Sequence, residues 1–247
     1  MNDQAPQRVA LVTGGSRGIG AAIVRRLAND GFAVAINCAA SEAEAQALAA
    51  EIRQAGGRAL AVRADVSRAA EVRALFDAML AEFGRIDVLV NSAGVLQVLP
   101  LAETSDELYD RTFDINTRGT FNTMREAATR LADGGSIVNV SSTTVALNLP
   151  GYSVYIASKA AVESLTQVFA KELRGRQIRV NAVAPGPVAT ELFFKGKSPE
   201  LIEHYTKMPP LERLGQPDDI AGIVSFLAGK DSGWVNGQIV RANGGVA

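Results

Sequence analysis

The chain has 247 residues, 47% of them hydrophobic, with a formal net charge of −1 and a single cysteine, Cys38. This length suffices for one α/β domain with a large core, and the charge balance argues against a nucleic-acid partner or an anionic membrane surface. One cysteine excludes an internal disulfide, and no apolar run reaches the ~20 residues of a membrane span, so a soluble, cytoplasmic protein is expected. The polar N-terminus, MNDQAPQ, shows no signal-peptide pattern.

Short apolar segments alternate with longer helical patterns along the whole chain. Strands are expected over 8–13, 32–37, 58–63, 86–91, 136–140, 178–184 and 238–242. Helices are expected over 21–31, 42–55, 69–83, 105–113, 115–131, 155–173 and 218–228. This alternation predicts the α/β class: a single-domain, Rossmann-type, doubly wound parallel sheet of about seven strands with helices on both faces. No linker or internal repeat divides the chain, so residues 1–247 are expected to form one domain.

A glycine-rich turn follows the first expected strand and precedes a helix. Its spacing, Gly14-x-x-x-Gly18-x-Gly20, differs from the more familiar Gly-x-Gly-x-x-Gly. Glycines let the backbone approach a pyrophosphate, and the helix N-terminus supplies N–H groups and the positive end of the helix dipole. The turn is therefore a candidate nucleotide-binding loop, with these candidate residues: Gly14, Ser16, Arg17, Gly18, Ile19 and Gly20.

Other candidate residues fall where expected strands end. Asp65, Asn91, Ser142 and Pro185 lie, like Gly14, at the carboxyl ends of strands. Ligands of doubly wound sheets bind beyond those ends, at one edge of the sheet. The convergence of these residues predicts a single ligand site.

Tyr155 and Lys159 stand four residues apart at the start of a long expected helix, and Ser142 follows a strand. Residues i and i+4 share a helix face, so the phenol and the ammonium can point into one cleft. A free tyrosine titrates near pH 10, and proton transfer near neutrality needs a pKa about three units lower, or roughly 4 kcal/mol. A unit charge about 4 Å away supplies about that energy at an effective dielectric constant of about 20. We therefore expect Lys159 to lower the pKa of Tyr155, so that the three side chains can protonate or deprotonate a carbonyl or alcohol oxygen.

Across essentially its whole length the sequence resembles the short-chain dehydrogenase/reductase family, including its NADP-dependent ketone reductases and 3-oxoacyl reductases. The matching positions are Thr13 to Gly20, Asp65-Val66, Asn91 to Gly94, Asn116, Ser142, Tyr155-x-x-x-Lys159 and Pro185-Gly186. Each motif is short, but they occur together, in order and at the family's spacing. One departure is Ser92, where the family often has a second asparagine.

The resemblance implies a role for each matching position. Tyr155 is the implied general acid in carbonyl reduction, with Ser142 holding the substrate oxygen and Lys159 gripping the nicotinamide ribose. Asn116 is implied to hold a water that links the lysine to solvent. Asp65 is implied to meet the adenine and Asn91 to support the cofactor loop. The implied cofactor-binding set is Gly14, Ser16, Arg17, Gly18, Ile19, Gly20, Asn37, Ser41, Asp65, Val66, Asn91, Ala93, Gly94, Tyr155, Lys159, Pro185, Gly186, Val188 and Thr190.

The end of the second expected strand bears on the choice of nicotinamide cofactor. It reads INCAAS over 36–41, with no carboxylate before Glu42. An NAD site usually places an acid there to bridge the ribose hydroxyls. Without that acid nothing repels a 2′-phosphate, Arg17 can offer a charge-assisted contact, and Asn37 and Ser41 can add neutral donors. NADP(H) is therefore the preferred cofactor, and NAD(H) is the alternative because the family includes NAD users with similar loops.

Residues 190–208 interrupt the alternation and correspond to the mobile substrate lid of the family. Candidate substrate contacts and walls are Phe193, Phe194, Val145, Leu147 and Tyr152. His204, the only histidine, is expected on the lid surface because the serine, tyrosine and lysine already supply an acid and its orienting groups. One histidine and one cysteine, far apart, offer no metal-ligand cluster, so no metal is expected.

The substrate class stays open between a small free ketone or alcohol and a carrier-linked 3-oxoacyl group. An acidic carrier protein favours basic residues near the cleft mouth, whereas residues 130–135 read RLADGG and include an aspartate. A third possibility, a nucleotide-sensing protein without chemistry, does not need the serine, tyrosine, lysine and Asn116 together. The sequence therefore favours an oxidoreductase that transfers a hydride between NADP(H) and a small free ketone or secondary alcohol.

Two apolar surfaces predict a homotetramer. The helical segment 160–173 has more apolar positions than one sheet contact needs: Val162, Leu165, Val168, Phe169 and Leu173. The C-terminal run 234–247 carries Trp234 and an expected strand at the edge of the sheet. In the family these two surfaces build two twofold interfaces, and two perpendicular twofold axes generate a tetramer of D₂ symmetry.

Overall fold

The computed structural model describes residues 6–247, so most of the polar N-terminal stretch lies outside the described residues. Seven strands form one sheet in the order β3-β2-β1-β4-β5-β6-β7, and every neighbouring pair is parallel. The strands are β1 (Val9–Thr13), β2 (Ala33–Cys38), β3 (Ala59–Arg63), β4 (Val88–Asn91), β5 (Ser136–Val140), β6 (Arg179–Pro185) and β7 (Ile239–Ala242). The doubly wound parallel sheet predicted from the alternation is thereby confirmed.

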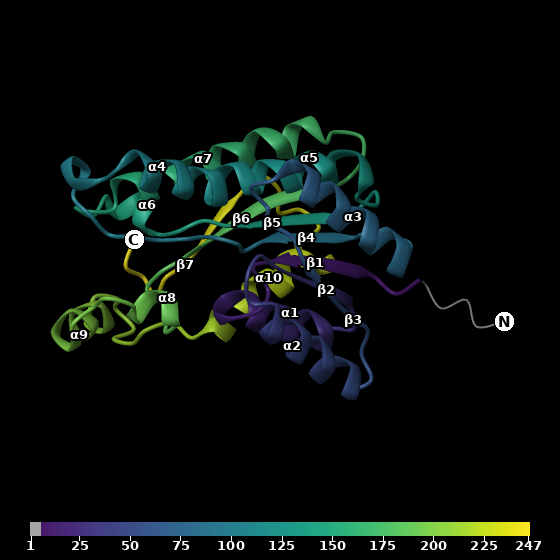
Figure 1. Cartoon of the computed structure of the whole chain (residues 1–247), viewed down its shortest axis with the longest axis horizontal. Coiled ribbons are helices and arrows are strands. Elements are labelled where there is room, and N and C mark those ends of the chain that lie inside the picture. Colours follow the sequence, from purple (N-terminus) through teal and green to yellow (C-terminus); the bar gives the residue numbers. More distant parts are fainter. Residues whose placement is uncertain (1–5) are drawn as a thin grey trace.

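Helices cover both faces of the sheet (Figure 1). One layer consists of α1 (Gly18–Asn29), α2 (Glu42–Gln54) and α10 (Pro217–Ala228). The opposite layer consists of α3 (Ala69–Phe83), α4 (Asp106–Phe113), α5 (Gly119–Arg130) and α7 (Ser153–Glu172). Shorter helical segments are η1 (Leu101–Glu103), η2 (Asp114–Arg118), α6 (Thr144–Leu147), α8 (Glu191–Phe194), α9 (Pro199–Lys207) and η3 (Lys230–Ser232). None of the helices described over residues 6–247 has the length and apolar character of a membrane span.

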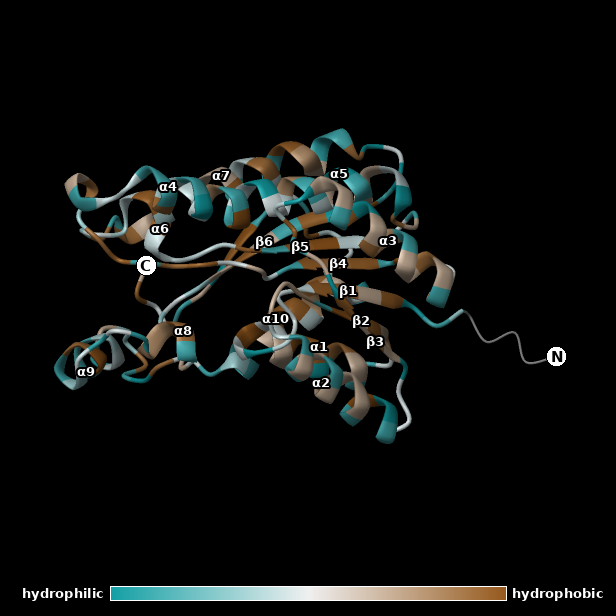
Figure 2. Ribbon diagram, in the orientation of Figure 1, coloured by the Kyte–Doolittle hydropathy of each residue, from teal (hydrophilic) through white to brown (hydrophobic). Residues whose placement is uncertain are grey.

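Each face of the sheet carries its own hydrophobic core, because successive side chains of a strand point to opposite faces. On one face, Val12 packs in a cluster with Ile23 and Leu27 of α1. On the other face, Leu11 packs in a cluster with Phe76 of α3. The strands therefore read as continuous apolar runs, which is typical of parallel sheets covered on both sides (Figure 2).

Two regions differ from the sequence-based expectation. The helices expected over 105–113 and 115–131 are joined by the π-helical turn η2, so that α4, η2 and α5 run on without a break. The lid segment contains two helices where only an irregular stretch was expected. Each of these helices begins at a side-chain cap. The hydroxyl of Thr190 accepts a hydrogen bond from Phe193 N at 3.2 Å, and the hydroxyl of Ser198 accepts one from Leu201 N at 3.3 Å. Figure 1 shows α8 and α9 standing beyond the carboxyl edge of the sheet.

Candidate active site

The glycine-rich turn leaves the sheet at its switch point, where β1 lies between β2 and β4. Gly14 has a φ of +61°, and a Cβ added there would lie 2.7 Å from the Cα of Ala93. A Cβ at Gly20 would overlap the carbonyl oxygen of Gly14. The hydroxyl of Thr13 accepts from Ser92 N at 3.1 Å and from Ala93 N at 3.2 Å. The loop after β4 is thus held through its main-chain N–H groups by the side chain of Thr13, contacts that do not involve the side chain of residue 92.

The N-terminus of α1 is suited to bind a phosphate group. Arg17 occupies the N-cap position in extended conformation, and no side chain caps the helix. The first-turn N–H groups of an uncapped helix are free to bind an anion, with Ser16 and Ile19 beside them. The close glycine cradle and this uncapped helix fit the pyrophosphate of the dinucleotide expected from the sequence.

The end of β2 differs in part from the expected donor set. The amide of Asn37 is buried and donates to the carbonyl oxygens of Ala64 at 2.9 Å and Val62 at 3.3 Å, so it is not a free donor for a 2′-phosphate. Ser41 precedes α2 without forming a side-chain cap, which leaves its hydroxyl available. Burial, and to a lesser degree the charge of Glu42, raises the pKa of the Cys38 thiol.

Two arginines flank this strand end, and only one was identified from the sequence. Arg17 is exposed, and its guanidinium lies 4.0 Å from the carboxylate of Glu191 at the start of the lid. Arg63 ends β3 opposite Cys38 in the sheet register, and its Nε donates to Ala39 O at 3.3 Å. The sequence shows only that Arg63 ends an expected strand. That this strand lies beside β2 follows from the strand order, which the sequence alone does not give.

The loop after β3 is shaped by Asp65 and Val66. The carboxylate of Asp65 accepts from the amide of Ser67 at 2.9 Å and from its hydroxyl at 2.7 Å. Asn122 donates to the carbonyl oxygen of Val66 at 2.9 Å, and a Cβ at Gly119 would lie 2.6 Å from the Val66 side chain. These contacts order the loop, and the adenine contact of Asp65 stays a prediction.

Asn91 belongs to a chain of buried polar side chains that crosses beneath the site. Its carbonyl oxygen accepts from the hydroxyl of Thr123 on α5 at 2.7 Å, and its amide donates to Asn139 of β5 at 2.8 Å. Asn139 in turn donates to the hydroxyl of Thr166 on α7 at 2.8 Å. This polar chain, Thr123–Asn91–Asn139–Thr166, ties two helices to two neighbouring strands. Asn91 therefore ties β4 to β5 and α5, and its support of the cofactor loop stays a prediction.

The end of β5 and the start of α7 bring the expected catalytic residues together. The hydroxyl of Ser142 accepts from that of Thr144 at 2.9 Å, and it lies near enough to the phenol of Tyr155 to lower the pKa of that phenol. Lys159 is 5% exposed, and its ammonium donates to the carbonyl oxygen of Val140 at 2.8 Å. The Nζ atom lies 5.9 Å from the centre of the Tyr155 ring. Three polar groups from two separate elements thus share one site, as the spacing predicted.

The pKa of Tyr155 shifts in the opposite direction to the one we expected. Burial raises it above the ordinary value of a tyrosine, and the hydrogen bond with Ser142 only partly opposes that increase. The expectation that Lys159 lowers this pKa assumed a charge about 4 Å from the phenol. In the structure the ammonium is drawn to Val140 instead, and burial lowers the pKa of Lys159 from 10.5 to about 8.

Asn116 acts as a clamp between the β4 loop and α7. It lies in η2 and is fully buried. Its side-chain oxygen accepts from Val95 N at 2.8 Å, and its amide donates to Val95 O and to the hydroxyl of Ser158, both at 3.0 Å. A Cβ at Gly94 would lie 3.3 Å from this side chain and 3.4 Å from Lys159 Nζ. The side chain is therefore fully engaged with protein groups, and the water-holding role stays a prediction.

The expected lid segment, residues 190–208, meets the start of α7 through aromatic side chains. Tyr152, beside α7, is buried, and its hydroxyl lies 3.3 Å from that of Tyr205 on α9. The ring of Tyr152 is 6.4 Å from that of Tyr155, and Tyr205 lies edge-on to Phe193 at 5.8 Å. Burial and the tyrosine pair raise the pKa of Tyr152. Phe193 thus faces the aromatic group, whereas Phe194 is 41% exposed.

The remaining predicted site residues fall around this centre. Val145 and Leu147, on α6, are half-buried, and His204 is exposed on α9 as expected. Thr190 Cγ2 would lie 3.5 Å from a Cβ at Gly18, so the lid starts beside the glycine turn. Pro185, Gly186 and Val188 form the turn after β6, where the carbonyl oxygen of Pro185 accepts from Thr143 N at 2.9 Å. Within residues 6–247, histidine, cysteine and carboxylate side chains form no group of three that could hold a metal.

Comparison with known proteins identifies the family. A family model described as enoyl-(acyl carrier protein) reductase matches residues 14–247. An NADPH-dependent aldehyde reductase-like protein of Arabidopsis thaliana is 46% identical over 253 residues, which cover 96% of this chain and 93% of that protein. A short-chain dehydrogenase/reductase from Serratia marcescens superposes with a TM-score of 0.93 at 39% identity over 98% of both chains. A short chain dehydrogenase from Burkholderia cenocepacia, solved with NADP, superposes with a TM-score of 0.92 at 37% identity over 98% of this chain and 99% of that one. With these matches and this site, the chain belongs to the short-chain dehydrogenase/reductase family of oxidoreductases.

Proposed function

We propose that the protein is an NADP(H)-dependent reductase of small free carbonyl compounds, chiefly ketones, with Tyr155 as the general acid. The observation that carries this proposal is the meeting of Ser142, Tyr155 and Lys159 beside the glycine turn, within one edge of the sheet. An oxygen acceptor site, a proton donor and a cation in one place are the groups that carbonyl reduction needs. A protein that only senses a nucleotide has no use for them.

Each residue of the proposed site has its own role in carbonyl reduction. The nicotinamide cofactor, when bound, supplies the hydride. Ser142 donates a hydrogen bond to the carbonyl oxygen and holds it next to the phenol of Tyr155, which then delivers its proton to the developing alkoxide. Because the pKa of Tyr155 is raised, the phenol is protonated at neutral pH. This protonation state supports the reductive direction.

The turn around α1 and the end of β2 support NADP(H) over NAD(H). No carboxylate occupies positions 38–41, Arg17 is exposed at the N-terminus of α1, and Arg63 on β3 is the register partner of Cys38. Two cations and no acid favour a 2′-phosphate. The named cofactor of the Arabidopsis relative and the NADP bound to the Burkholderia structure agree with this choice.

Replacing Cys38 by aspartate is expected to reverse the cofactor preference. The new carboxylate repels a 2′-phosphate by like charge, and about 1–3 kcal/mol of repulsion corresponds to a loss of about 5- to 150-fold in kcat/KM with NADPH. Cys38→Asn is the matched control, because asparagine has nearly the same shape as aspartate but carries no charge. Comparable kcat/KM values for NADH and NADPH in the unaltered protein would contradict the proposed preference.

The lining of the site supports a small organic carbonyl compound rather than a carrier-linked acyl group. Tyr152, Phe193 and Tyr205 provide aromatic walls beside Tyr155. Arg130, the basic residue considered from the sequence, lies near the amino ends of β4 and β5, away from the carboxyl ends that carry the site, and it forms ion pairs with acidic residues of α3 and α5. Its charge is therefore already compensated within the protein.

A panel of substrates tests the proposed function. It contains free ketones, aldehydes and 3-oxoacyl thioesters, offered with NADPH, and the loss of NADPH absorbance is followed. We expect turnover of free carbonyl compounds. Faster turnover of the carrier thioester would favour the carrier alternative, and absence of any turnover would favour the nucleotide-sensing alternative.

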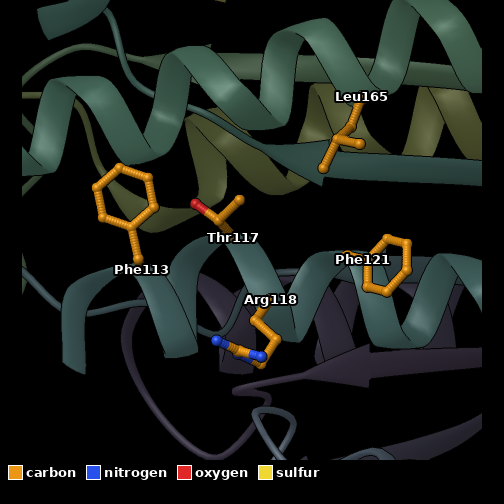
Figure 3. Close-up of a pocket in the computed structure, with 5 residues that line it drawn as sticks. All are labelled: Phe113, Thr117, Arg118, Phe121 and Leu165. Atoms are coloured by element: carbon orange, nitrogen blue, oxygen red, sulfur yellow. The ribbon is translucent and has the colours of Figure 1, made fainter. Parts of the chain in front are cut away.

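We also propose that the protein is a homotetramer, because two separate apolar surfaces face outward. Val168 of α7 is 54% exposed and Phe121 of α5 is 44% exposed. Between these helices a cavity of about 290 Å³ is lined by Phe113, Thr117, Arg118, Phe121 and Leu165 (Figure 3). On the second surface, Trp234 is 99% exposed before the edge strand β7, and Phe226 of α10 is 44% exposed. Large exposed apolar residues in two groups favour two interfaces.

Light scattering coupled to size exclusion at micromolar concentration is expected to give four times the chain mass of 26.0 kDa. Val168→Asp is expected to halve that mass, since a buried unpaired charge disrupts the α5–α7 surface. Leu101→Asp, at an exposed apolar position of η1, is the control and should leave the mass unchanged. A mass near that of one chain would refute the proposal, and a mass of two chains would leave one interface standing.

A further inference from the structure

A third residue of α7, Glu163, lies on the same helix face as the catalytic pair, Tyr155 and Lys159, and the three side chains form one stripe along the helix. Tyr155, Lys159 and Glu163 are spaced four residues apart, so they share one face of the helix. Glu163 had no role in the sequence analysis. Its carboxylate accepts a hydrogen bond of 2.6 Å from the hydroxyl of Ser141. The contact between Glu163 and Ser141 therefore adds to the contacts that the catalytic pair makes with the end of β5.

The contacts of this stripe hold three consecutive residues of the chain. Lys159 binds the carbonyl oxygen of Val140, the last residue of β5. Glu163 binds the side chain of Ser141, and the hydroxyl of Ser142 meets the phenol of Tyr155. The two residues that precede Ser142 are thus both fastened to α7, on the C-terminal side of Tyr155.

The surroundings of the hydrogen bond between Ser141 and Glu163 favour a strong interaction. Ser141 is 2% exposed, and its main-chain N–H is already committed to Val183 O at 2.8 Å. Glu163 is half-buried, and within residues 6–247 no lysine or arginine lies within 4.0 Å of its carboxylate. A hydroxyl donating to a carboxylate in such surroundings forms a short, charge-assisted bond. The hydroxyl of Ser141 is therefore the hydrogen-bond donor that stabilises this carboxylate.

We propose that Glu163 is a positioning residue, which sets the place of Ser142 against Tyr155 by holding the neighbouring Ser141. The inference rests on the proposed reductase function and adds a residue to it. Loss of the bond frees the strand end to move, and a displacement of about 1 Å at a reacting centre can cost about 10²-fold in rate. Glu163 and Ser141 are not among the proposed cofactor-binding residues, and the glycine turn between β1 and α1 lies outside this strand end, so cofactor affinity is expected to stay close to that of the unaltered protein.

Four variants separate this role from a merely structural one. Glu163→Leu and Ser141→Ala each remove the bond, Glu163→Gln keeps an acceptor oxygen without the charge, and the double variant Ser141→Ala/Glu163→Leu removes both partners. We expect each bond-breaking single variant to lower kcat about 10- to 100-fold, with the NADPH dissociation constant, measured by fluorescence, unchanged. Glu163→Gln should recover most of kcat, and the double variant should be no slower than the worse single variant because the two residues act through one bond.

Hydrogen exchange of the segment 141–147 provides a readout that does not depend on turnover. Within it, Thr143 N donates to Pro185 O at 2.9 Å and Ala146 N to Thr143 O at 2.9 Å. We expect faster exchange there in Glu163→Leu and in Ser141→Ala, and the ordinary rate in Glu163→Gln. If exchange changes in this way while the unaltered protein reduces no carbonyl compound, the proposed function fails and the positioning contact stands. Unchanged exchange, additive losses of kcat or weaker NADPH binding would each overturn the positioning role.

Discussion

Replacing Tyr155 by phenylalanine is expected to lower kcat for carbonyl reduction by about 10²- to 10⁴-fold. The variant keeps the ring and removes the only proton that the proposed mechanism transfers from this position. The phenol is paired with Ser142, and the ammonium of Lys159 is committed to Val140, so no second acid stands at the same place. We therefore expect a loss at the upper end of the range. NADPH consumption under substrate saturation measures it.

Cofactor binding should survive this substitution, because the hydroxyl is not part of the glycine turn. The NADPH dissociation constant of Tyr155→Phe, followed by fluorescence, is expected to stay close to that of the unaltered protein. Tyr109→Phe is the matched control, since Tyr109 is 48% exposed on α4 and stacks on Phe113. Near-full reductase activity in Tyr155→Phe would show that another group is the acid.

Replacing Lys159 by methionine is expected to lower kcat/KM by at least about 10²-fold, because the ammonium serves both the reacting site and the ribose of the cofactor. Methionine keeps the length and apolar stem of the side chain, so the buried site is filled without a charge. Unlike Tyr155→Phe, this variant should also bind NADPH more weakly. Turnover and the dissociation constant, measured on the same samples, distinguish the two variants.

The same substitution is expected to change how stability depends on pH. Burial lowers the pKa of Lys159 from 10.5 to about 8, so below pH 8 the folded and unfolded chains both carry the charge and the folded chain bears its burial cost. Between about pH 8 and 10.5 the folded chain releases the proton first. The free energy of unfolding of the unaltered protein therefore rises with pH across this window, relative to Lys159→Met, by about 3 kcal/mol. Denaturant titrations of both proteins at several pH values measure the difference, and a constant difference would exclude the lowered pKa.

The sequence predicted the sheet and the meeting of Ser142 with Tyr155, because both depend on local signals. A strand that ends at Val140 and a helix that starts before Tyr155 bring these side chains to one edge, whatever the detail of the connecting loop. The two helices of the lid were missed, although Ser198 and Pro199 form a readable start signal. The absence of a strong apolar pattern around them outweighed that signal.

Properties that depend on three-dimensional neighbours could not be predicted. The side-chain amide of Asn37 donates hydrogen bonds to carbonyl oxygens at the end of β3, and nothing in the sequence around Asn37 indicates these partners. The pKa of Tyr155 was expected to fall because a charge about 4 Å away stabilises the phenolate, whereas the burial of the phenol, which depends on the fold around it, raises that pKa. Lys159 was expected to face the phenol, and it donates to Val140 instead. The tetramer and the cytoplasmic location stay predictions.

The polar chain Thr123–Asn91–Asn139–Thr166 has a consequence for how this protein can evolve. Removing Asn91 or Asn139 alone leaves the buried amide of the other without its partner, at a cost of about 1–3 kcal/mol, whereas Thr123 and Thr166 keep hydrogen bonds to carbonyl oxygens of their own helices. Replacing the two connected asparagines together by apolar groups of similar shape is nearly neutral. Single substitutions at Asn91 or Asn139 are therefore selected against even where the paired change is tolerated. The two asparagines form an epistatic unit, and a directed-evolution library built from this sequence should vary them jointly or leave both fixed.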